Sequence, residues 1–371
     1  MLYDRFFKNP EGASDLLDKI GAYASQAGTI RLMEICGTHT MAIARSGLRT
    51  VLPPDVRLIS GPGCPVCVTP AGAIDMILEL SERPGVLIAS YGDLLRVPGS
   101  TRGDSLLSRR ARGAMVESVY SPMDAVRIAA SRPELEVVFL GVGFETTAPG
   151  TAACILEAAE QKLENFSVLC LLKRTEPALR ALIEAPDFAV DGFLCPGHVA
   201  AVIGSEAFSF LPRDYGLPGV VSGFDPADLL GSVLELTRMI AEKRPALRNE
   251  YTRLVQPAGN PLALRLMDEV FQTAPSGWRG LGRIEDSGYV LREKYRSWDA
   301  WAKFALRPAA SGDIPGCRCA EVIRGTASPV SCPLFGRICT PEDPAGPCMV
   351  SGEGACAAAY QYGNNASQQE V

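Results

Sequence analysis

The feature that most constrains the fold is a regular alternation between residues 30 and 240, where short apolar runs take turns with amphipathic, helix-like segments. The apolar runs lie at 29–36, 55–60, 85–90, 134–141, 167–173, 190–195 and 219–224. Most of them lead into polar, glycine-rich turns, and this pattern is typical of repeated βα units. The sequence therefore predicts an α/β fold with Rossmann-like parallel sheets, in which ligands bind at the carboxyl ends of the strands.

A weak internal repeat suggests that the α/β part consists of two related units. Three short stretches recur in the same order, namely 34–40 with 141–147, 59–66 with 194–200, and 88–95 with 220–230. We expect two related domains, at 29–130 and 131–240, although chance similarity of glycine-rich turns would give the same pattern. Residues 241–371 read as a third, mainly helical or irregular domain, on which residues 1–28 could pack.

Composition excludes several classes of function. The chain of 371 residues is 47% hydrophobic and 21% charged, and its net charge of −6 is spread over both signs without long runs. Nucleic-acid binding needs a clustered basic face, which the sequence lacks. No apolar run reaches the roughly 18 residues of a membrane helix, and the first residues do not resemble a signal peptide. We expect a cytoplasmic protein, in which twelve cysteines indicate metal or redox chemistry rather than structural disulfides.

Half of the cysteines fall within the last 55 residues, and they give the strongest chemical signal. Fourteen residues separate Cys317 from Cys332, six separate Cys332 from Cys339, and sixteen separate Cys339 from Cys356. Four thiolates in loops suit a zinc ion or an iron–sulfur cluster. Tight zinc knuckles are absent from this spacing, and the proline- and glycine-rich surroundings favour a 4Fe–4S cluster.

The two remaining C-terminal cysteines are Cys319 and Cys348. Each is close in sequence to a predicted ligand, which would suit a redox-active thiol pair beside the cluster. Cys154 and Cys170 lie in apolar patterns and are expected to be small core residues.

Polar residues at the predicted strand ends form a second group of candidates. Cys36 and His39 lie in "CGTHT", where a helix N-terminus would lower the pKa of the thiol. The only other histidine, His198, lies in the similar turn "PGHV", and Glu145 lies in "GFETT". A histidine in a turn is often structural and Glu145 could simply belong to a helix cap, but together these residues suggest a reactive sheet edge.

The stretch "SGPGCPVCVTP" places Cys64 and Cys67 in a Cys-x-x-Cys spacing between prolines and glycines. Half of a zinc site, a redox disulfide and a stiff turn all use this spacing. If the βα interpretation holds, the pair emerges at the same sheet edge as Cys36, where it could bind metal or pass electrons.

Taken together, "CGTHT", "GPGCPVCV", "GFETTAP", "PGHV", "CPLFG" and "CMVSGEGAC" resemble the HypD-type hydrogenase maturation factors, from about residue 30 to residue 356. The resemblance implies two related α/β domains, a cluster domain, and a scaffold function in building the Fe(CN)₂CO centre of nickel–iron hydrogenases. It implies a small HypC-type chaperone that shares the iron and a HypE-type partner that delivers cyanide, with the hydrogenase large subunit as the indirect recipient.

The resemblance also implies roles for individual residues. Cys36 would bind the iron that carries cyanide and carbon monoxide, with His39 beside it, and Cys64 and Cys67 would be a dithiol/disulfide pair. The 4Fe–4S ligands would be Cys317, Cys332, Cys339 and Cys356. Cys319 and Cys348 would be the nearby thiol pair, in an arrangement similar to ferredoxin:thioredoxin reductase.

Two rival interpretations share parts of this pattern. A stand-alone iron–sulfur thiol/disulfide oxidoreductase would need the cluster and the thiol pairs but no iron on Cys36. A structural zinc protein would act only as an assembly platform. Whether the chain is itself an enzyme or a scaffold with redox activity is open at this stage.

Overall fold

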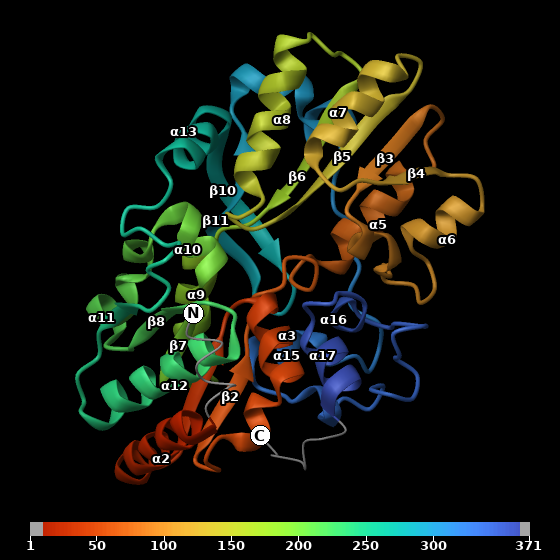
Figure 1. Ribbon diagram of the computed structural model, residues 1–371. Coiled ribbons are helices and arrows are strands. Elements are labelled where there is room, and N and C mark those ends of the chain that lie inside the picture. The colour runs from red at the N-terminus through yellow and green to blue at the C-terminus, as the bar shows by residue number, and fades with distance from the viewer. Residues whose placement is uncertain (1–9, 364–371) are drawn as a thin grey trace.

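The computed structural model describes residues 10–363 and contains two parallel sheets, one antiparallel hairpin and a cysteine-rich C-terminal region (Figure 1). Sheet A has the order β2 (Val56–Ser60), β1 (Ile30–Glu34), β7 (Gly192–Pro196), β8 (Gly219–Ser222) and β9 (Leu247–Asn249). Sheet B has the order β4 (Met115–Ser118), β3 (Val86–Ser90), β5 (Glu136–Gly143) and β6 (Phe166–Leu172). The predicted α/β class is confirmed.

The helices have the following bounds: α2 Pro10–Ala27, α3 Gly37–Ser46, α4 Leu48–Val51, α5 Ala71–Leu80, α6 Leu106–Ala111, α7 Pro122–Ser131, α8 Ala148–Glu160, α9 Thr175–Ile183, α10 Gly197–Ile203, α11 Phe210–Tyr215, α12 Pro226–Ala241, α13 Pro261–Val270, α14 Ala300–Lys303, α15 Cys319–Arg324, α16 Pro347–Val350 and α17 Ala355–Tyr362. Short 3₁₀ turns are η1 Gly92–Arg96, η2 Ser205–Phe208, η3 Glu293–Trp298 and η4 Pro329–Ser331. None of the helices between residues 10 and 363 combines the length and apolar character needed to cross a membrane.

Membership of the sheets does not follow the expected division at residues 130 and 131. Strands β1 and β2 pair with the much later β7, β8 and β9, while β3 to β6 form the other sheet. The chain therefore leaves sheet A after β2, builds sheet B, and returns. The pairing of β1 with β7, from Leu32 opposite Gly192 to Glu34 opposite Leu194, is a long-range contact that local periodicity does not reveal.

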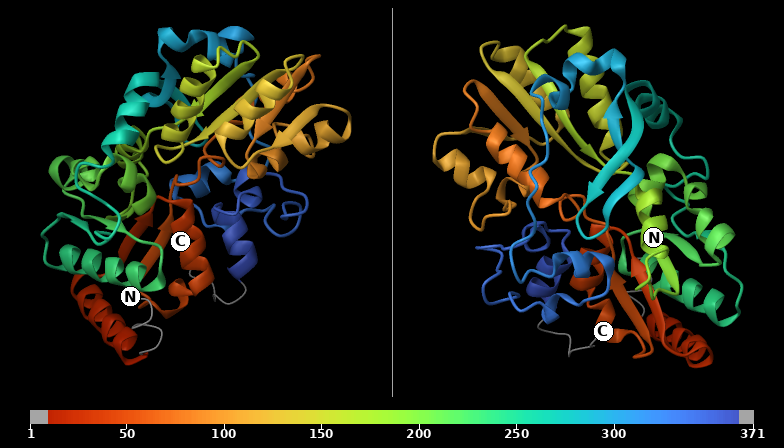
Figure 2. Two further views of the ribbon diagram at one scale, coloured as in Figure 1. Left: turned by 45° about the horizontal axis from the view of Figure 1, so that its top comes forward. Right: turned by 180° about the vertical axis from the view of Figure 1, so that it is seen from behind.

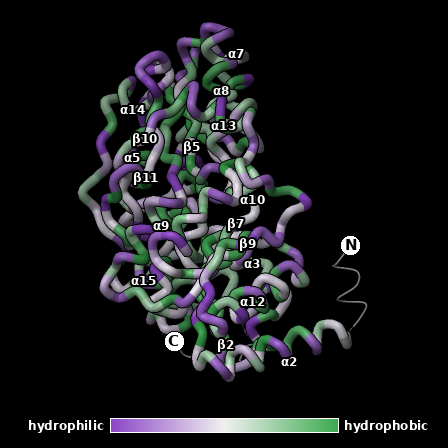
Figure 3. The backbone as a smooth tube through the Cα atoms, turned by 90° about the vertical axis from the view of Figure 1, so that its left-hand side faces the viewer, coloured by the Kyte–Doolittle hydropathy of each residue, from purple (hydrophilic) through white to green (hydrophobic). Residues whose placement is uncertain are grey.

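The central strands of both sheets are buried on both faces, as is typical of parallel sheets, whereas the edge strands β2, β4 and β9 are only partly buried. The residues of β3 are all buried, and so is nearly all of β5. In Figure 3 the hydrophobic colour runs along β5 and β7 in the interior. The N-terminal helix α2 packs on α12 through Ile20 and Ala24, within the core of sheet A. The described part of the N-terminal segment, from residue 10 onward, thus has its main contacts with α12.

An antiparallel hairpin, β10 (Phe271–Trp278) and β11 (Gly282–Leu291), occupies a stretch that was expected to be irregular. Its strands are polar, and the register shifts between Ala274 and Ser276, on either side of Pro275. A proline cannot donate to the ladder, so the alternation that marks a strand is interrupted. The hairpin extends from sheet B toward α15 (Figures 1 and 2).

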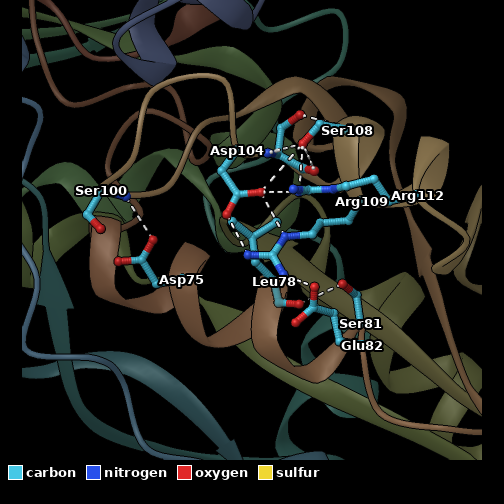
Figure 4. A network of polar contacts seen from close by, with 10 residues as sticks. Asp75, Leu78, Ser81, Glu82, Ser100, Asp104, Ser108, Arg109 and Arg112 are labelled. Atoms are coloured by element: carbon cyan, nitrogen blue, oxygen red, sulfur yellow. Dashed lines mark hydrogen bonds and ion pairs between the residues drawn. The ribbon is translucent and has the colours of Figure 1, made fainter.

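A polar network braces the loop between η1 and α6 at the edge of sheet B (Figure 4). Asp104 accepts hydrogen bonds from Arg109 Nε and Arg112 Nη2, both at 2.7 Å, and these charges lower the pKa of its carboxyl group. The Ser100 N–H donates to Asp75 at 2.8 Å. The same loop also reaches the C-terminal region, because Arg102 pairs with Asp343. The network therefore helps to hold the cysteine-rich region against sheet B.

Candidate functional site

Cys36 follows β1 directly and is the N-cap residue of α3, as the sequence predicts. Its side chain makes no capping hydrogen bond, although the nearby backbone N–H groups of His39 and Thr38 act to lower the pKa of the thiol. Burial nevertheless raises the pKa of the Cys36 thiol to about 12, and the carboxyl groups of Glu353 and Glu34 add to the rise. The expectation of a lowered pKa is wrong for the metal-free chain, because desolvation outweighs the helix N-terminus.

Two carboxyl groups beside Cys36 were not singled out from the sequence. Glu34 is fully buried and accepts hydrogen bonds from Thr40 Oγ1 at 2.5 Å and from the Cys36 N–H at 3.3 Å. Burial raises the pKa of Glu34 to about 7 despite these bonds. Glu353 comes from the loop between α16 and α17 and accepts from Thr38 Oγ1 at 2.7 Å. Glu353 lies in "CMVSGEGAC", one of the stretches that carried the family resemblance, and Glu34 lies in the internal repeat at 34–40, but neither carboxyl group was predicted to be a site residue.

The Cys-x-x-Cys loop after β2 packs directly on Cys36. The Gly37 N–H donates to Gly63 O at 3.1 Å, and a side chain at Gly63 would collide with the backbone of Cys36. Cys64 and Cys67 form a disulfide with their Cα atoms 5.2 Å apart, and both are buried. The sequence left open whether this pair is half of a zinc site, a disulfide or a stiff turn. The structure supports the disulfide, which lies at the same sheet edge as Cys36.

Both histidines pack against one aromatic ring, that of Phe224, which the sequence analysis did not single out. The ring centroid of Phe224 lies 4.7 Å from that of His39 and 3.8 Å from that of His198. His39 is fully buried, its Nε2 donates to Gly223 O at 3.0 Å, and its Nδ1 has no partner within residues 10–363. Burial lowers the pKa of His39 to about 4, so that its imidazole is neutral at neutral pH. Burial also lowers the pKa of the more exposed His198.

Glu145 follows β5 and is buried, but its contacts are those of a structural carboxylate. It accepts from the Thr175 N–H at 2.8 Å and from Thr175 Oγ1 at 2.7 Å, and thereby ties the start of α9 to the end of β5. Burial raises its pKa. The described structure does not link Glu145 to Cys36 by any hydrogen bond.

The C-terminal cysteines gather around one small pocket, which is lined by Cys317, Cys319, Cys332, Cys339 and Cys356. Cys319 is in hydrogen-bond contact with Cys317, Cys348 and Cys356. Gly346 lies so close that a side chain there would meet the sulfurs of Cys319 and Cys317. The four predicted ligands and the predicted pair are thus brought into one neighbourhood.

The thiols in this neighbourhood differ in acidity. The hydrogen bond from Cys319 lowers the pKa of Cys317 to about 7, and the charge of Arg279 acts in the same direction. The pKa of Cys319 is raised, and the largest cause is the hydrogen bond that its thiol donates to the sulfur of Cys317. Close thiols compete for protons in this way, so one of them becomes a thiolate more readily than the others.

The donor set fits an iron–sulfur cluster. The pocket is lined by five cysteines, which include the four predicted ligands, and four thiolates are the ligand set that 4Fe–4S clusters use. Within residues 10–363 no three His, Cys, Asp or Glu side chains are arranged around a point that would suit one metal ion. A cluster spreads its ligands over several irons, so its thiolates stand further apart than those of a single ion.

Two buried cations were also missed. Lys173, at the end of β6, donates to Gly277 O at 2.6 Å and to Ser276 Oγ at 3.0 Å, and burial lowers its pKa to about 7. Arg279 lies at the tip of the β10–β11 hairpin. Neither lies in a cysteine or histidine motif, and the sequence carried no signal for them because the hairpin itself was not predicted.

Comparisons with known proteins cover nearly the whole chain. A family model named HypD and described as the "Hydrogenase formation hypA family" matches residues 11–363. The chain is 45% identical to hydrogenase maturation factor HypD2 of Bradyrhizobium diazoefficiens, over 100% of this chain and 99% of the relative. It is 46% identical to hydrogenase maturation factor HypD of Azotobacter vinelandii, over 98% and 97%, and 44% identical to that of Escherichia coli, over 98% of each.

Proposed function

The chain belongs to the HypD family of hydrogenase maturation factors, and from this premise we propose that it is the scaffold and redox protein on which the Fe(CN)₂CO centre of nickel–iron hydrogenases is assembled. Its partners would be a HypC-type chaperone, which shares the iron, and a HypE-type donor of cyanide. The hydrogenase large subunit would receive the finished centre.

The observation that carries the proposal is the packing of the disulfide loop on Cys36. Gly63 O accepts from the Gly37 N–H, so a thiol suited to iron and a redox-active pair share one sheet edge. Cys36 would bind the cargo iron as a thiolate, because soft thiolate ligands suit iron and the metal displaces the proton. The neutral imidazole of His39 and the carboxyl groups of Glu34 and Glu353 line the same end of α3.

Cyanide release from a protein thiocyanate requires two electrons, and the Cys64/Cys67 pair can supply them. In the dithiol state, one thiocyanate and two thiols give one thiolate, one cyanide, one Cys64–Cys67 disulfide and two protons. The carbon–sulfur bond breaks, the sulfur–sulfur bond forms, and the cyanide goes to the iron. The chain as described, with the disulfide closed, corresponds to the oxidised end of this step.

The disulfide must then be reduced for another turn. Cys319 and Cys348 are in contact and can give two electrons and two protons by closing their own disulfide. A 4Fe–4S cluster held by Cys317, Cys332, Cys339 and Cys356 would supply the single electrons that restore this pair.

The test is an infrared spectrum of the chain purified without oxygen after co-production with its HypC-type and HypE-type partners. We expect bands of metal-bound carbon monoxide and cyanide in the unaltered chain and their complete loss in Cys36→Ala. Cys64→Ser should keep the iron–sulfur absorbance but lose the cyanide bands. Cys154→Ala is the matched control, because Cys154 is also buried but lies on α8, and it should keep all bands.

Two outcomes would contradict the proposal. Bands that survive in Cys36→Ala would show that this thiol does not hold the iron. Cyanide bands at full strength in Cys64→Ser would remove the redox role of the Cys64/Cys67 pair.

The alternative function is a stand-alone iron–sulfur thiol/disulfide oxidoreductase. The disulfide and the nearby group of thiols favour it. The burial of Cys64 and Cys67 does not separate the two functions, because a protein disulfide and a protein thiocyanate would both have to reach these sulfurs. Reduction of a protein disulfide by the chain alone, with no carbon monoxide or cyanide bands in the spectrum above, would favour the alternative.

A further inference from the structure

Arg279 is a buried arginine that connects the disulfide loop with the C-terminal thiols. Its backbone N–H donates to Val68 O at 2.8 Å, and its side-chain Nε donates to Thr69 O at 3.1 Å. These two acceptors lie one and two residues beyond Cys67. Its Nη1 pairs with Asp313, while its Nη2 is buried without a partner in the described part of the chain. A buried guanidinium with a free donor is costly, so its position calls for an explanation.

The position of Arg279 is set by the hairpin and not by its own flexibility. The next residue, Gly280, has a positive φ of 79°, and a side chain there would lie 2.7 Å from Ala320 O on α15. On the other side, the amine of Lys173 donates a hydrogen bond to Gly277 O and so holds the second strand residue before Arg279 in place. The hairpin tip is therefore pressed between the disulfide loop and the helix that begins with Cys319 (Figure 1).

The ion pair of Arg279 and Asp313 lies next to the cysteine region. Asp313 precedes Cys317 by four residues in the sequence, and the hairpin tip contacts Ala320, the residue after Cys319. Arg279 and Asp313 thus form a pair whose net field at the cysteines can be changed in either direction by substituting one partner.

We propose that Arg279 is a positioning residue for both redox centres: it holds the disulfide loop through Val68 and Thr69, and it places a positive charge beside the cysteines proposed to bind the cluster. The second part rests on the proposed cluster. Reduction of a cluster adds one negative charge, so a nearby cation favours the reduced state and raises the reduction potential. Asp313 has the opposite effect.

The experiment measures the cluster's midpoint potential by an anaerobic redox titration followed by electron paramagnetic resonance. Arg279→Gln removes the positive charge and should lower the midpoint potential. We expect the equilibrium constant for reduction to fall about tenfold, which corresponds to ~59 mV for a one-electron couple. Arg279→Lys keeps the charge and should stay closer to the unaltered chain. Asp313→Asn should shift the potential upward. Arg283→Gln removes an exposed arginine from the same hairpin and serves as the matched control.

A second readout needs no cluster. In the metal-free chain, hydrogen exchange of residues 64–69 should become faster in Arg279→Gln, because the side-chain hydrogen bond to Thr69 O is lost, and should not change in Arg283→Gln. Asp313→Asn leaves both anchors in place, so it tests the charge even if Arg279→Gln folds poorly.

Potentials that move in the same direction in Arg279→Gln and Asp313→Asn, or that do not move, would overturn the role of the charge. Unchanged exchange of residues 64–69 in Arg279→Gln would overturn the anchoring role. An unaltered chain that binds no cluster would instead remove the cluster from the proposed function, and with it the charge part of this inference.

Discussion

Cys36 and Cys332 are both proposed to bind iron, yet the chain holds them in different ways. Cys36 stands at the end of a parallel strand and caps a helix, so backbone hydrogen bonds place it. Cys332 follows a single 3₁₀ turn in a region with little regular structure. The sheet edge is built from a strand and a helix with regular backbone hydrogen bonds, whereas the C-terminal region consists of short helices, 3₁₀ turns and loops around the thiols. We expect the second region to rely on its cluster for stability far more than the first.

The largest expected effect follows from removing iron. Chelation, or Cys332→Ser, should weaken the protection of residues 310–363 against hydrogen exchange by about 3 kcal/mol or more, since a group bound only by the folded state stabilises that state. Strands β1, β3 and β5 should keep their protection. Cys170→Ala, in β6 and away from the pocket, is the control. Equal loss in both regions would mean that the two are one cooperative unit.

The next effect compares two glycines that touch cysteines. In Gly63→Ala the new methyl group meets the backbone of Cys36, which cannot move without disturbing β1. In Gly346→Ala it meets the sulfurs of Cys319 and Cys317, which can rotate away. We expect Gly63→Ala to lower the free energy of unfolding by about 2–3 kcal/mol and Gly346→Ala by about 1 kcal/mol, as measured by urea titration of the metal-free chain.

Gly150→Ala, on α8, where the new methyl group would meet only Pro122 Cγ at an ordinary contact distance of 3.9 Å, should not destabilise the chain and serves as the control for both glycines. If Gly346→Ala proved the more damaging of the two, the thiol region would be the more rigid one, and the comparison would be reversed.

The smallest expected effect concerns pH. Burial lowers the pKa of Lys173 to about 7, while a lysine in the unfolded chain titrates near pH 10.4. Between these values the unfolded chain binds more protons than the folded one, so the free energy of unfolding rises with pH. Well below pH 7 the amine is charged in both states, and its burial then costs its full amount of free energy.

The Lys173 contribution is measured as the difference between the unaltered chain and Lys173→Met at pH 7 and at pH 9. The unaltered chain should gain about 1–2 kcal/mol relative to the variant over this interval. Lys303→Met, which removes a partly exposed lysine near sheet B, should show no such gain. A difference that is constant with pH would mean that Lys173 stays charged in the folded chain.

Several parts of this protein were determined by local sequence. Apolar runs bounded by glycine-rich turns specify parallel strands, and the residues just after them, such as Cys36 and Glu145, must then lie at the carboxyl edges. The Cys64–Cys67 spacing already limits the geometry, since a disulfide requires close Cα atoms. The order of the motifs was sufficient to indicate the family.

Other features were decided only by tertiary structure, because they depend on segments far apart in the chain. The pairing of β1 with β7 assigns the early strands to sheet A rather than to a domain ending at residue 130. Burial reverses the expected effect of a helix N-terminus on the Cys36 thiol, and burial is a property of the whole fold. The contact of Glu353 with Thr38 and the bridge made by Arg279 join residues more than 200 positions apart, and no local pattern records such contacts.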